Sequence, residues 1–475
     1  MRRAKIVCTM GPATATYDRV LSLVDAGMDV ARLNLSHGTH ADHEQIYELI
    51  RRAGDETGRG VGILADLQGP KIRLGMFASG PVHLDEGATF TITTDPEMGT
   101  ADRVSTTYAG LPEDVLVGNP ILVDDGKVAL EVIDVAGADV VTKVVVPGWV
   151  SNHKGLNLPG VAVSSPALTE KDVTDLRWAV RTGVDMVALS FVRRASDIDR
   201  VHEVMDSEGR RMPVLAKVEK PEAIKALPEI VAAFNGVMVA RGDLGVELPL
   251  EEVPLEQKRA IDLCRRAAKP VIVATQMLDS MTTDSRPTRA EASDVANAVL
   301  DGADALMLSA ETSVGEHPPL VVTTMSKIIS HVEELALERI PAMPRDHHGS
   351  TARAMTRAAV DVADSVHAKY VIAFTETGST ARLIARHRPA IPLLAFTPNP
   401  SVRSKLALVW GVETFLAPNV QQTDDLVKTV DSALLDIRRA RRGDRVVIVA
   451  GVPPGLPGTT NGMRVHEMGH GWLPD

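Results

Sequence analysis

Short apolar runs alternate with longer amphipathic stretches along much of the chain, and this rhythm predicts strands alternating with helices. Three apolar runs come first, at Lys5–Thr9, Val30–Leu35 and Val61–Asp66. Helix-like stretches begin near Tyr17 and His40, between these runs. Such an order is typical of parallel strands joined by helices that pack against the sheet.

The rhythm changes between Gly69 and Pro166, where short alternating runs are interrupted by Gly, Pro and Asp. One stretch, ILVDDGKVALEVI, predicts a β-hairpin whose turn lies at Asp125 and Gly126. We therefore expect an all-β domain of the β-barrel type, inserted into the α/β region.

The α/β rhythm resumes at Thr169 and gives five further strands. Together with the three earlier strands they make eight, which predicts a (β/α)8 TIM barrel. Such barrels bind ligands at the carboxyl ends of their strands, and an insertion after the third strand leaves from that face, where it can close as a lid. The five strands are predicted at Met186–Phe191, Val214–Val218, Val237–Ala240, Val271–Thr275 and Ala305–Leu308.

A polar, proline-containing linker near residues 341–350 separates a third region, which predicts a small α/β domain with a mostly parallel sheet. We expect a catalytic barrel of residues 1–68 and 167–340, a lid of residues 69–166 and a C-terminal domain of residues 341–475. The strands of the third region are predicted at Tyr370–Thr375, Leu393–Thr397, Glu413–Leu416 and Val446–Ala450.

The amino-acid composition of the chain argues against several classes of protein. The net charge of −11 and the aromatic content of 3% argue against nucleic acid, which asks for a basic face and often for stacking rings. Cys8 and Cys264 stand in runs typical of a core, which indicates no disulfide framework and a reducing compartment. The start lacks the apolar region of a signal peptide, and no window of about 18 apolar residues occurs. We expect a cytoplasmic protein that binds neither nucleic acid nor membrane.

Charged residues follow two neighbouring predicted strands. Lys217 and Glu219 are two positions apart, so they point to the same side of an extended strand, and Arg241 and Asp243 repeat this spacing one unit later. Salt bridges at the rim of the sheet would explain an isolated pair. Two carboxylates that converge with an ammonium group, where Gly242 lets backbone approach a ligand, instead favour Mg²⁺ and a phosphate group.

The ends of other predicted strands are polar as well, and a solvated rim would rarely gather so many groups with one common partner. Two arginines, a lysine and paired carboxylates suit a phosphorylated carboxylic acid held against Mg²⁺. The further groups are Arg32, Asn34, Ser36, Asp66, Arg73, Thr275, Gln276, Ser309 and Glu311.

Several motifs resemble those of pyruvate kinases, in register from Lys5 to the last predicted strand. They include RLNLSHG, GPKIR, KGLNLPG, SFVR, AKVEK, MVARGDLGVE, ATQMLDSM and SRPTRAEASDVANAVLDGADALMLSAET. The resemblance implies a homotetrameric enzyme that converts phosphoenolpyruvate and ADP to pyruvate and ATP, the last step of glycolysis. It also implies a requirement for Mg²⁺, with Mn²⁺ as an alternative.

The resemblance further implies a role for individual residues. Mg²⁺ would be held by Glu219 and Asp243. Lys217, Arg73 and the metal would serve phosphoryl transfer, and lid closure would exclude water. The residues expected to bind phosphoenolpyruvate are Arg32, Lys217, Gly242, Asp243 and Thr275. Those expected to bind ADP or ATP are Asn34, Leu35, Ser36, His37, Arg73 and Lys154. The enolpyruvate would receive its proton from Thr275, through a water molecule and with Ser309 and Glu311 behind it.

Lys71 is a departure from the family pattern, because many members carry Glu at this position of GPKIR. In those members K⁺ is held by residues that match Asn34, Ser36, Asp66 and the carbonyl of Leu67. This set is intact, so K⁺ can still bind. The fixed ammonium group of Lys71 supplies a positive charge on the same loop, however, and we expect K⁺ not to be required.

A loop in the third region predicts a site for a phosphorylated allosteric effector. The segment Thr375, Glu376, Thr377, Gly378, Ser379, Thr380 follows a strand and opens a helix, where hydroxyl and backbone N–H groups can bind phosphate. An ordinary helix cap would explain the same residues, but the resembling family binds a sugar phosphate there. The loop Val452–Asn461 lacks Arg, Lys and Trp, which favours an effector with one well-held phosphate.

Two further motifs are better explained without function. His466 to His470 fits the zinc-protease pattern H-E-x-x-H, but Gly469 interrupts the helix that this pattern needs. The basic cluster Arg438–Arg442 closes a predicted helix, where cations complement the helix dipole.

The sequence is also compatible with two rival functions. A Mg²⁺-dependent lyase acting through a pyruvate enolate could share the barrel and its carboxylates, although it would need neither the lid nor Lys154. An inactive sugar-phosphate sensor is the rival without catalysis, and it would be expected to lack part of the strand-end set.

Overall fold

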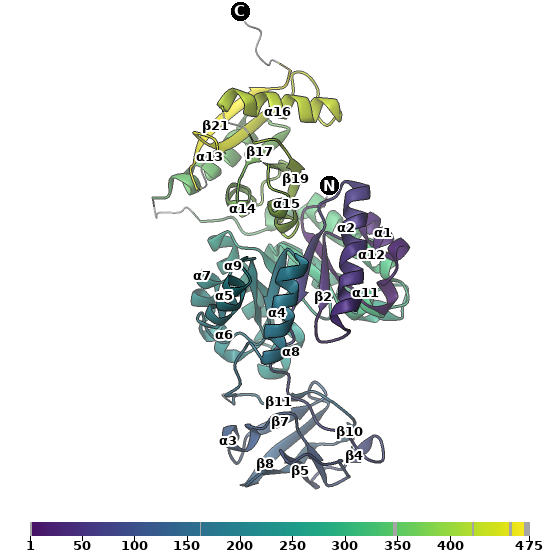
Figure 1. Ribbon diagram of the computed structural model, residues 1–475. Coiled ribbons are helices and arrows are strands. Elements are labelled where there is room, and N and C mark those ends of the chain that lie inside the picture. Colours follow the sequence, from purple (N-terminus) through teal and green to yellow (C-terminus); the bar gives the residue numbers. More distant parts are fainter. Residues whose placement is uncertain (1, 162, 345–348, 420–421, 456–457, 470–475) are drawn as a thin grey trace, which may run out of the picture.

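The computed structural model describes residues 2–161, 163–344, 349–419, 422–455 and 458–469. Three bodies follow one another along a single axis in Figure 1: an all-β domain at one end, a barrel in the middle and an α/β domain at the other end. The lid and the C-terminal domain therefore contact opposite ends of the barrel.

Eight parallel strands close into the barrel, which confirms the predicted fold. Apolar, β-branched runs form these strands because both faces of the sheet are covered. In barrel order they are β1 (Lys5–Thr9), β2 (Val30–Asn34), β3 (Gly62–Asp66), β12 (Met186–Leu189), β13 (Val214–Val218), β14 (Gly236–Ala240), β15 (Val271–Ala274) and β16 (Ala305–Leu308).

Helices surround the barrel, and capping residues in the sequence mark where several of them begin and end. Three of them begin at a threonine whose hydroxyl accepts from the backbone three residues on, and end at a glycine in the left-handed conformation. The helices are α1 (Tyr17–Ala26), α2 (His40–Thr57), α4 (Glu170–Thr182), α5 (Asp197–Ser207), α6 (Pro221–Lys225), α7 (Leu227–Ala233), α8 (Arg241–Glu247), α9 (Val253–Ala267), α10 (Arg289–Asp301), α11 (Ala310–Ser313) and α12 (Pro318–Ala336).

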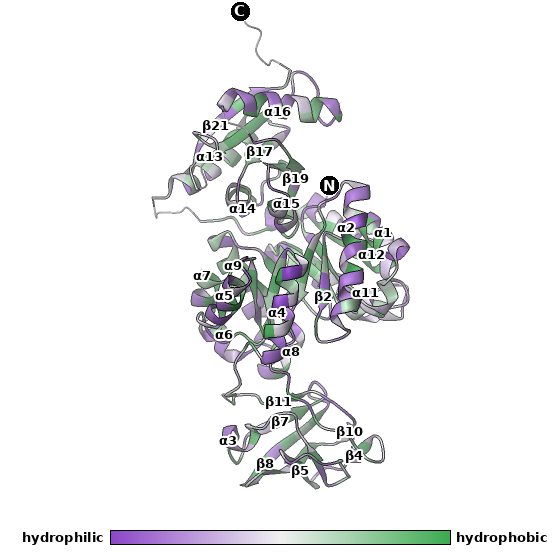
Figure 2. Ribbon diagram, viewed as in Figure 1, coloured by the Kyte–Doolittle hydropathy of each residue, from purple (hydrophilic) through white to green (hydrophobic). Residues whose placement is uncertain are grey.

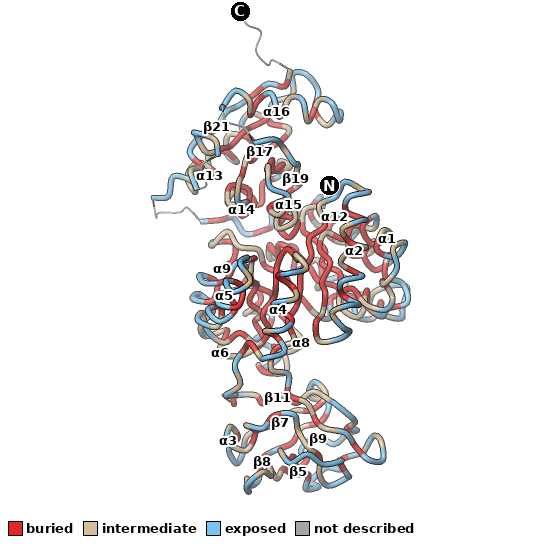
Figure 3. Tube along the Cα trace, in the orientation of Figure 1, coloured by how far each residue is buried: buried red, intermediate tan, exposed pale blue. Residues whose placement is uncertain are grey.

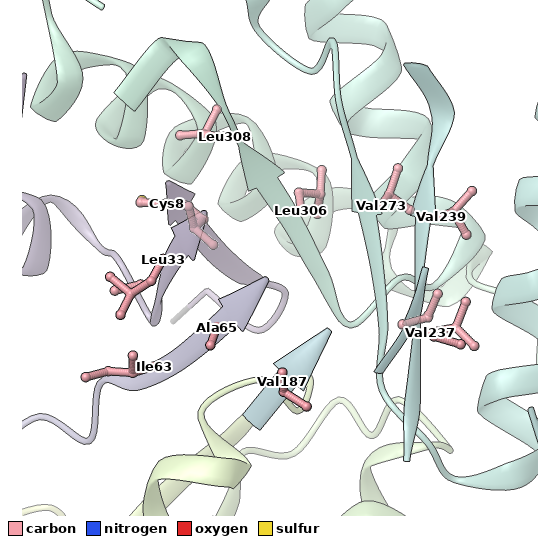
Figure 4. Packing of buried hydrophobic residues seen from close by; sticks show 14 of the residues in the cluster. Cys8, Leu33, Ile63, Ala65, Val187, Val237, Val239, Val273, Leu306 and Leu308 are labelled. Carbon is pink, nitrogen blue, oxygen red and sulfur yellow. The ribbon is translucent and has the colours of Figure 1, made fainter. Parts of the chain in front are cut away.

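Alternate residues of each barrel strand face opposite sides. Val7 belongs to the cluster that fills the barrel, whereas its neighbours Ile6 and Cys8 belong to the layer beneath the helices. Figure 4 shows part of this outer layer, and Figure 3 shows that buried residues are concentrated in the barrel strands. The helices turn polar residues outward, as the hydropathy colours of Figure 2 show.

The amino ends of the barrel strands are closed by the C-terminal domain. Ala407 and Leu408 join the cluster inside the barrel, and Trp410, 1% exposed, joins the outer core. The buried Lys5 donates from Nζ to the carbonyl of Val412 at 2.9 Å. The segment 407–412 therefore acts as a plug at this end of the barrel.

The inserted domain is a half-closed barrel of two sheets that share one core. A six-stranded sheet runs β11-β7-β8-β9-β5-β6, and β10 pairs with β4. The predicted hairpin is confirmed: β7 and β8 pair from Val123 to Val128, and Asp124, Asp125 and Gly126 adopt positive φ in the turn. The elements are β4 (Val82–Leu84), β5 (Thr89–Thr93), β6 (Arg103–Ser105), α3 (Leu111–Asp114), β7 (Pro120–Val123), β8 (Val128–Ala136), β9 (Asp139–Val146), β10 (Gly148–Val150) and β11 (Leu156–Asn157).

The C-terminal domain holds a five-stranded sheet in the order β19-β18-β17-β20-β21. Four strands are parallel, as predicted, and β21 pairs with β20 in the antiparallel sense. The elements are α13 (Thr351–Ser365), β17 (Tyr370–Phe374), α14 (Ser379–Ala385), β18 (Leu393–Thr397), α15 (Pro400–Leu406), β19 (Val412–Leu416), α16 (Thr423–Asp436), β20 (Arg445–Gly451) and β21 (Thr460–Glu467).

Both discounted motifs have structural explanations. His466 lies in β21 rather than in a helix and shares a hydrogen bond of 2.8 Å with Asp431, while His470 lies outside the described residues. In the basic cluster, Arg439 forms a salt bridge of 2.8 Å with Glu413. Among the described helices, none is long and apolar enough to cross a membrane.

Candidate active site

A buried network of charges lies at the carboxyl ends of the barrel strands, on the side of the lid. Asp66 at the end of β3 contacts Arg32 of β2 at 2.7 Å and Lys217 of β13 at 3.3 Å. Lys217 also contacts Glu219 at 2.9 Å, as the spacing of two residues in a strand predicts. The carboxylates of Asp66 and Glu219 are both 1% exposed, so their charges act on Lys217 with little screening by water.

The network fixes the charge of Lys217. Burial alone would lower the pKa of this ammonium group, but Asp66 and Glu219 outweigh it and the pKa is raised. Burial likewise opposes ionisation of Asp66, yet Lys217 and Arg32 hold the pKa of its carboxyl below the usual value. Burial and the charge of Asp243 raise the pKa of Glu219, although Lys217 opposes them. Lys217 therefore stays protonated at neutral pH.

Ser190 also holds Lys217. The serine follows β12, is fully buried and accepts a hydrogen bond of 2.7 Å from Lys217 Nζ. Its hydroxyl then donates to the carbonyl of Leu67 at 2.6 Å. No pattern of spacing or charge singles out this serine, although it stands next to Phe191 in the motif SFVR.

Asp243 and Gly242 lie in the first turn of α8, directly after β14. The backbone N–H of Gly242 donates to Thr275 Oγ1 at 2.7 Å. Asp243 is close enough to influence the pKa of both Lys217 and Glu219. Two carboxylates from neighbouring strands thus face one ammonium group.

Arg241 does not repeat the geometry of Lys217, and this prediction was wrong. Its guanidinium group contacts Asp294 at 2.7 Å and donates to the carbonyl of Thr275 at 2.7 Å. The reason is that residues 241–247 form a helix, in which a spacing of two residues does not place side chains on one face. Arg241 supports the turn after β15 instead.

Thr275 lies in a strained turn after β15. Its φ is +69° and that of Gln276 is +54°, both unusual for residues with a side chain. Thr275 Oγ1 donates to the carbonyl of Ala274 at 2.6 Å. No hydrogen bond between described residues joins this hydroxyl to Ser309 or Glu311.

Glu311 is held by backbone groups beneath the site. Its carboxylate accepts from the N–H of Ser309 at 2.6 Å and from that of Leu278 at 3.2 Å. Burial raises the pKa of Glu311. Ser309 Oγ is buried, with no hydrogen-bond partner among the described residues.

The residues expected to bind the nucleotide come from both the barrel and the inserted domain. Burial and then the charges of Arg73, Lys71 and Arg32 lower the pKa of His37, so these cations lie around the loop after β2. Arg73 donates to the carbonyl of His153 at 3.0 Å. Within the lid, Lys154 forms a salt bridge of 2.9 Å with Asp124. Of Arg73 and Lys154, only Arg73 is thus shown near the His37 loop.

A cleft of about 640 Å³, counting the part that opens to solvent, lies between lid and barrel. Lys71 and Asn157 line it from the lid side, and Phe191, Lys220 and Asp243 line it from the barrel. The cleft therefore opens onto one of the two carboxylates described above.

Models of known families match most of the chain: the pyruvate kinase barrel domain matches residues 1–322, and the pyruvate kinase alpha/beta domain matches residues 353–466. The chain belongs to the pyruvate kinase family. It is a phosphotransferase, and the family's substrates are phosphoenolpyruvate and ADP.

Individual pyruvate kinases agree with this assignment. That of Mycobacterium tuberculosis is 60% identical over 469 residues, which cover 98% of this chain and 99% of the relative. That of Corynebacterium glutamicum is 58% identical over 471 residues, covering 98% of both. The crystal structure of a pyruvate kinase from Cryptosporidium parvum superimposes with a TM-score of 0.90 at 35% identity, covering 98% of this chain and 96% of that one. The lyase and sensor alternatives find no support.

A second pocket, of about 570 Å³ with its part that opens to solvent, lies in the C-terminal domain of this pyruvate kinase family member. Thr375, Glu376, Thr377, Ser379 and Thr380 line it, as the loop between β17 and α14 predicts. Gly378 adopts φ +83° at the start of α14 and donates its N–H to Thr375 Oγ1 at 2.9 Å. The hydroxyl of Thr380 shares a hydrogen bond of 2.7 Å with Thr460 of β21.

Proposed function

We propose that phosphoenolpyruvate binds at the carboxyl ends of the barrel strands, with its phosphoryl group at Lys217. The observation that carries this proposal is the buried ammonium group of Lys217, held by Glu219, Asp66 and Ser190. A fixed cation of this kind stabilises the charge that develops on phosphoryl oxygens during transfer. The full set that would contact the substrate is Arg32, Lys217, Gly242, Asp243 and Thr275.

Glu219 and Asp243 would hold the divalent cation, Mg²⁺ or Mn²⁺. They fit this role because the charge of Asp243 raises the pKa of Glu219, a repulsion that a divalent cation would relieve, and Mg²⁺ takes one or two protein carboxylates together with water and substrate oxygens. When bound, the ion neutralises charge on the phosphoryl group. Lys217 and the carboxylates hold the reacting group in line with the nucleotide.

The nucleotide would lie between the loop after β2 and the lid, against Asn34, Leu35, Ser36 and His37 on one side and Arg73 and Lys154 on the other. Lys154 now contacts Asp124, so a nucleotide phosphate would take the place of that carboxylate. Closure of the lid over the cleft would exclude water, which otherwise competes with ADP for the phosphoryl group.

Thr275 would position the proton that enolpyruvate takes up at carbon. Because its hydroxyl already donates to Ala274, the proton would pass through a water molecule. Glu311, whose carboxyl has a raised pKa, and the hydroxyl of Ser309, which has no hydrogen-bond partner in the described part of the chain, would support that water.

A coupled assay for pyruvate formation tests this proposal, with Mg²⁺ present and then chelated. Lys217→Met should reduce turnover by roughly 10³ to 10⁵, the value of a charge clamp in phosphoryl transfer. Lys225→Met is the matched control, because Lys225 is exposed at the end of α6. A loss below about tenfold for Lys217→Met would show that this lysine is structural.

A phosphorylated effector would bind the pocket at Thr375, Glu376, Thr377, Gly378, Ser379 and Thr380. Hydroxyl groups and the start of α14 support a phosphate there. Sugar monophosphates, nucleoside monophosphates and fructose 1,6-bisphosphate can be compared as activators. We expect a monophosphate to activate most strongly and Ser379→Asp to abolish its effect. Strong activation by the bisphosphate would contradict the single-phosphate part.

A homotetramer is the proposed assembly. The edge strand β21 supports it: no described strand pairs with its outer side, and its Val465 is exposed, so this edge is suited to contact another copy of the chain. Sedimentation of the purified chain should give the mass of four copies, and a monomer at micromolar concentration would rule this assembly out.

A further inference from the structure

The loop that follows β2 is held by the amino end of a neighbouring helix. Lys171 is the second residue of α4, and its Nζ donates to the carbonyl of Leu35 at 2.7 Å. Leu35 stands between Asn34 and Ser36, two of the residues proposed to contact the nucleotide. Figure 1 shows α4 beside α2, the helix into which this loop leads. A side chain of one helix thus reaches the backbone of the loop that precedes the other.

A buried carboxylate connects the two ends of this loop. Asp175 is 4% exposed, and one of its oxygens accepts from Lys171 Nζ at 2.6 Å. Its other oxygen shares a hydrogen bond of 2.8 Å with Nε2 of His40, the first residue of α2. Because Lys171 also binds the carbonyl of Leu35, the loop is tied to Asp175 where it begins and where it ends.

Two further contacts hold the backbone of the loop. The N–H of Leu35 donates to the carbonyl of Asp66 at 3.0 Å, and His43 Nε2 donates to the carbonyl of His37 at 2.8 Å. Both backbone polar groups of the buried Leu35 are therefore used, one of them by Lys171. The side chain of Lys171 is 51% exposed, so its replacement opens no cavity in the core.

An ordinary ion pair within a helix would also join Lys171 to Asp175, which are four positions apart. The place of Lys171 in the helix argues against this as its main role. A cation in the first turn opposes the helix dipole, and the favourable order of such a pair has the acidic residue first. Lys171 stands in the first turn and precedes its carboxylate. Helix stability therefore does not account for this lysine, whereas the contact with Leu35 does.

We propose that Lys171 is a positioning residue for ADP: it fixes the carbonyl of Leu35 and so keeps residues 34–37 in the conformation that meets the nucleotide. This inference rests on the proposed placement of the nucleotide at that loop. Lys171 acts through the backbone and does not touch ADP. The next residue, Asp172, accepts from the N–H of Gly69 at 3.0 Å, at the start of the predicted lid. One end of α4 thus holds both the nucleotide loop and the first residue of the lid.

Steady-state kinetics of pyruvate formation by Lys171→Met tests the proposal. KM for ADP should rise about three- to tenfold, because one hydrogen bond from a charged donor is lost while the other contacts of the loop remain. KM for phosphoenolpyruvate should stay within about twofold of the parent value, since Lys171 does not hold the residues proposed to bind that substrate. Lys171→Arg keeps a cationic donor and should restore most of the affinity for ADP.

Arg181→Met is the matched control, because it removes another ion pair of α4, with Glu208 at 2.8 Å, at the opposite end of the helix. It should leave KM for ADP unchanged. Hydrogen–deuterium exchange without nucleotide gives a second readout. In Lys171→Met the amides of residues 35–37 should exchange faster than in the parent, whereas those of residues 174–182 should keep the parent rate. Unchanged exchange in the loop overturns the inference, and so does an equal rise of KM for ADP in Arg181→Met.

His37→Ala separates this inference from the proposed nucleotide site. The imidazole of His37 is exposed, and the hold on the loop uses only the carbonyl of this residue, so the variant tests contact with the nucleotide alone. If Lys171→Met leaves KM for ADP unchanged while His37→Ala raises it, the inference is wrong and the nucleotide site stands. If neither variant changes KM for ADP, the inference and the placement of the nucleotide are both wrong.

Discussion

Ser190 carries one of the hydrogen bonds that hold the ammonium group of Lys217. Its hydroxyl accepts from Lys217 Nζ at 2.7 Å and donates to the carbonyl of Leu67 at 2.6 Å. Because Leu67 directly follows Asp66, the serine ties Lys217 to the end of β3 by a second route beside the salt bridge with Asp66. We infer that Ser190 positions Lys217, the lysine proposed to serve phosphoryl transfer, without touching substrate.

Ser190→Ala should lower kcat for pyruvate formation about ten- to hundredfold, because displacement of a catalytic group by about 1 Å costs up to 10²-fold. KM for phosphoenolpyruvate should change less, since Arg32 and Gly242 remain in place. Ser207→Ala is the matched control: its hydroxyl caps a carbonyl in α5, away from the strand ends. Equal losses in kcat from both variants would point to a general loss of stability.

The spacing of charged residues along the sequence predicts some of the contacts in the candidate active site and misses others. Lys217 and Glu219 could be paired from the sequence because a strand places residues two apart on one side. Arg241 and Asp243 have the same spacing, but the strand has already ended and a helix has begun, so the inference failed. Ser190 was missed because a single serine after a strand carries no pattern, and only its contact with Lys217 reveals its role.

Among the elements, the loop after β3 contains Lys71, which is exposed and yet close enough to His37 to lower the pKa of that imidazole. Its ammonium group therefore acts on the region where K⁺ would be held by Asn34, Ser36, Asp66 and Leu67. Asp66 Oδ1 is buried and lies 3.3 Å from Lys217 Nζ, so K⁺ would have to share this oxygen with that ammonium group.

We expect the enzyme to keep its activity within a few-fold when K⁺ is replaced by a tetraalkylammonium ion at equal ionic strength. The reason is that Lys71 supplies a unit positive charge. Its interaction with a unit negative charge 4 Å away is worth roughly 4 kcal/mol at an effective dielectric of about 20. Lys71→Glu should create a dependence on K⁺, and Lys71→Gln should show a weaker one. If the activity of the unmodified enzyme falls more than about a hundredfold without K⁺ and returns when K⁺ is added, this prediction is wrong.

Element prediction succeeded where apolar runs are continuous and failed at β21. The eight barrel strands are buried on both sides, so their runs of Val, Ile, Leu and Ala stand out. Strand β21, TNGMRVHE, lies at the edge of its sheet and contains glycine, asparagine and charged residues. A strand at the edge of a sheet lacks the continuous apolar run of a strand that is covered on both faces, and this makes it hard to find in the sequence.

Several cations surround His387 at the junction between the barrel and the C-terminal domain. Burial, followed by Arg386, Arg357, Arg265 and Arg353, lowers the pKa of this imidazole to about 3. These residues come from α9, from α13 and from the segment that ends α14. His387 is thus neutral in the folded chain at pH values where an unfolded chain would protonate it.

Acid should therefore weaken the junction. The unfolded chain binds a proton at His387 below about pH 6.5, whereas the folded chain binds it only near pH 3. The contribution of His387 to the stability of the folded chain therefore falls as the pH drops from about 6.5 to about 3. At pH 5 the free energy of unfolding is lower by about 2 kcal/mol than at neutral pH because of this group. In His387→Gln, hydrogen exchange of residues 379–388 should accelerate less between pH 7 and pH 5 than in the parent, after correction for intrinsic rates. The same acceleration in both proteins would assign the acid sensitivity to other groups.

The plug formed by residues 407–412 also sets the order of events during synthesis. Domains commonly fold from the amino end as the chain leaves the ribosome, but here the interior of the barrel stays open until Leu408 has been made, late in a chain of 475 residues. A nascent chain that has completed β16 would still expose apolar side chains at the amino ends of its strands. Premature termination before the plug should therefore yield an insoluble product rather than a free catalytic domain, and a chimera with the C-terminal domain of a relative would have to keep the plug and the barrel from the same parent.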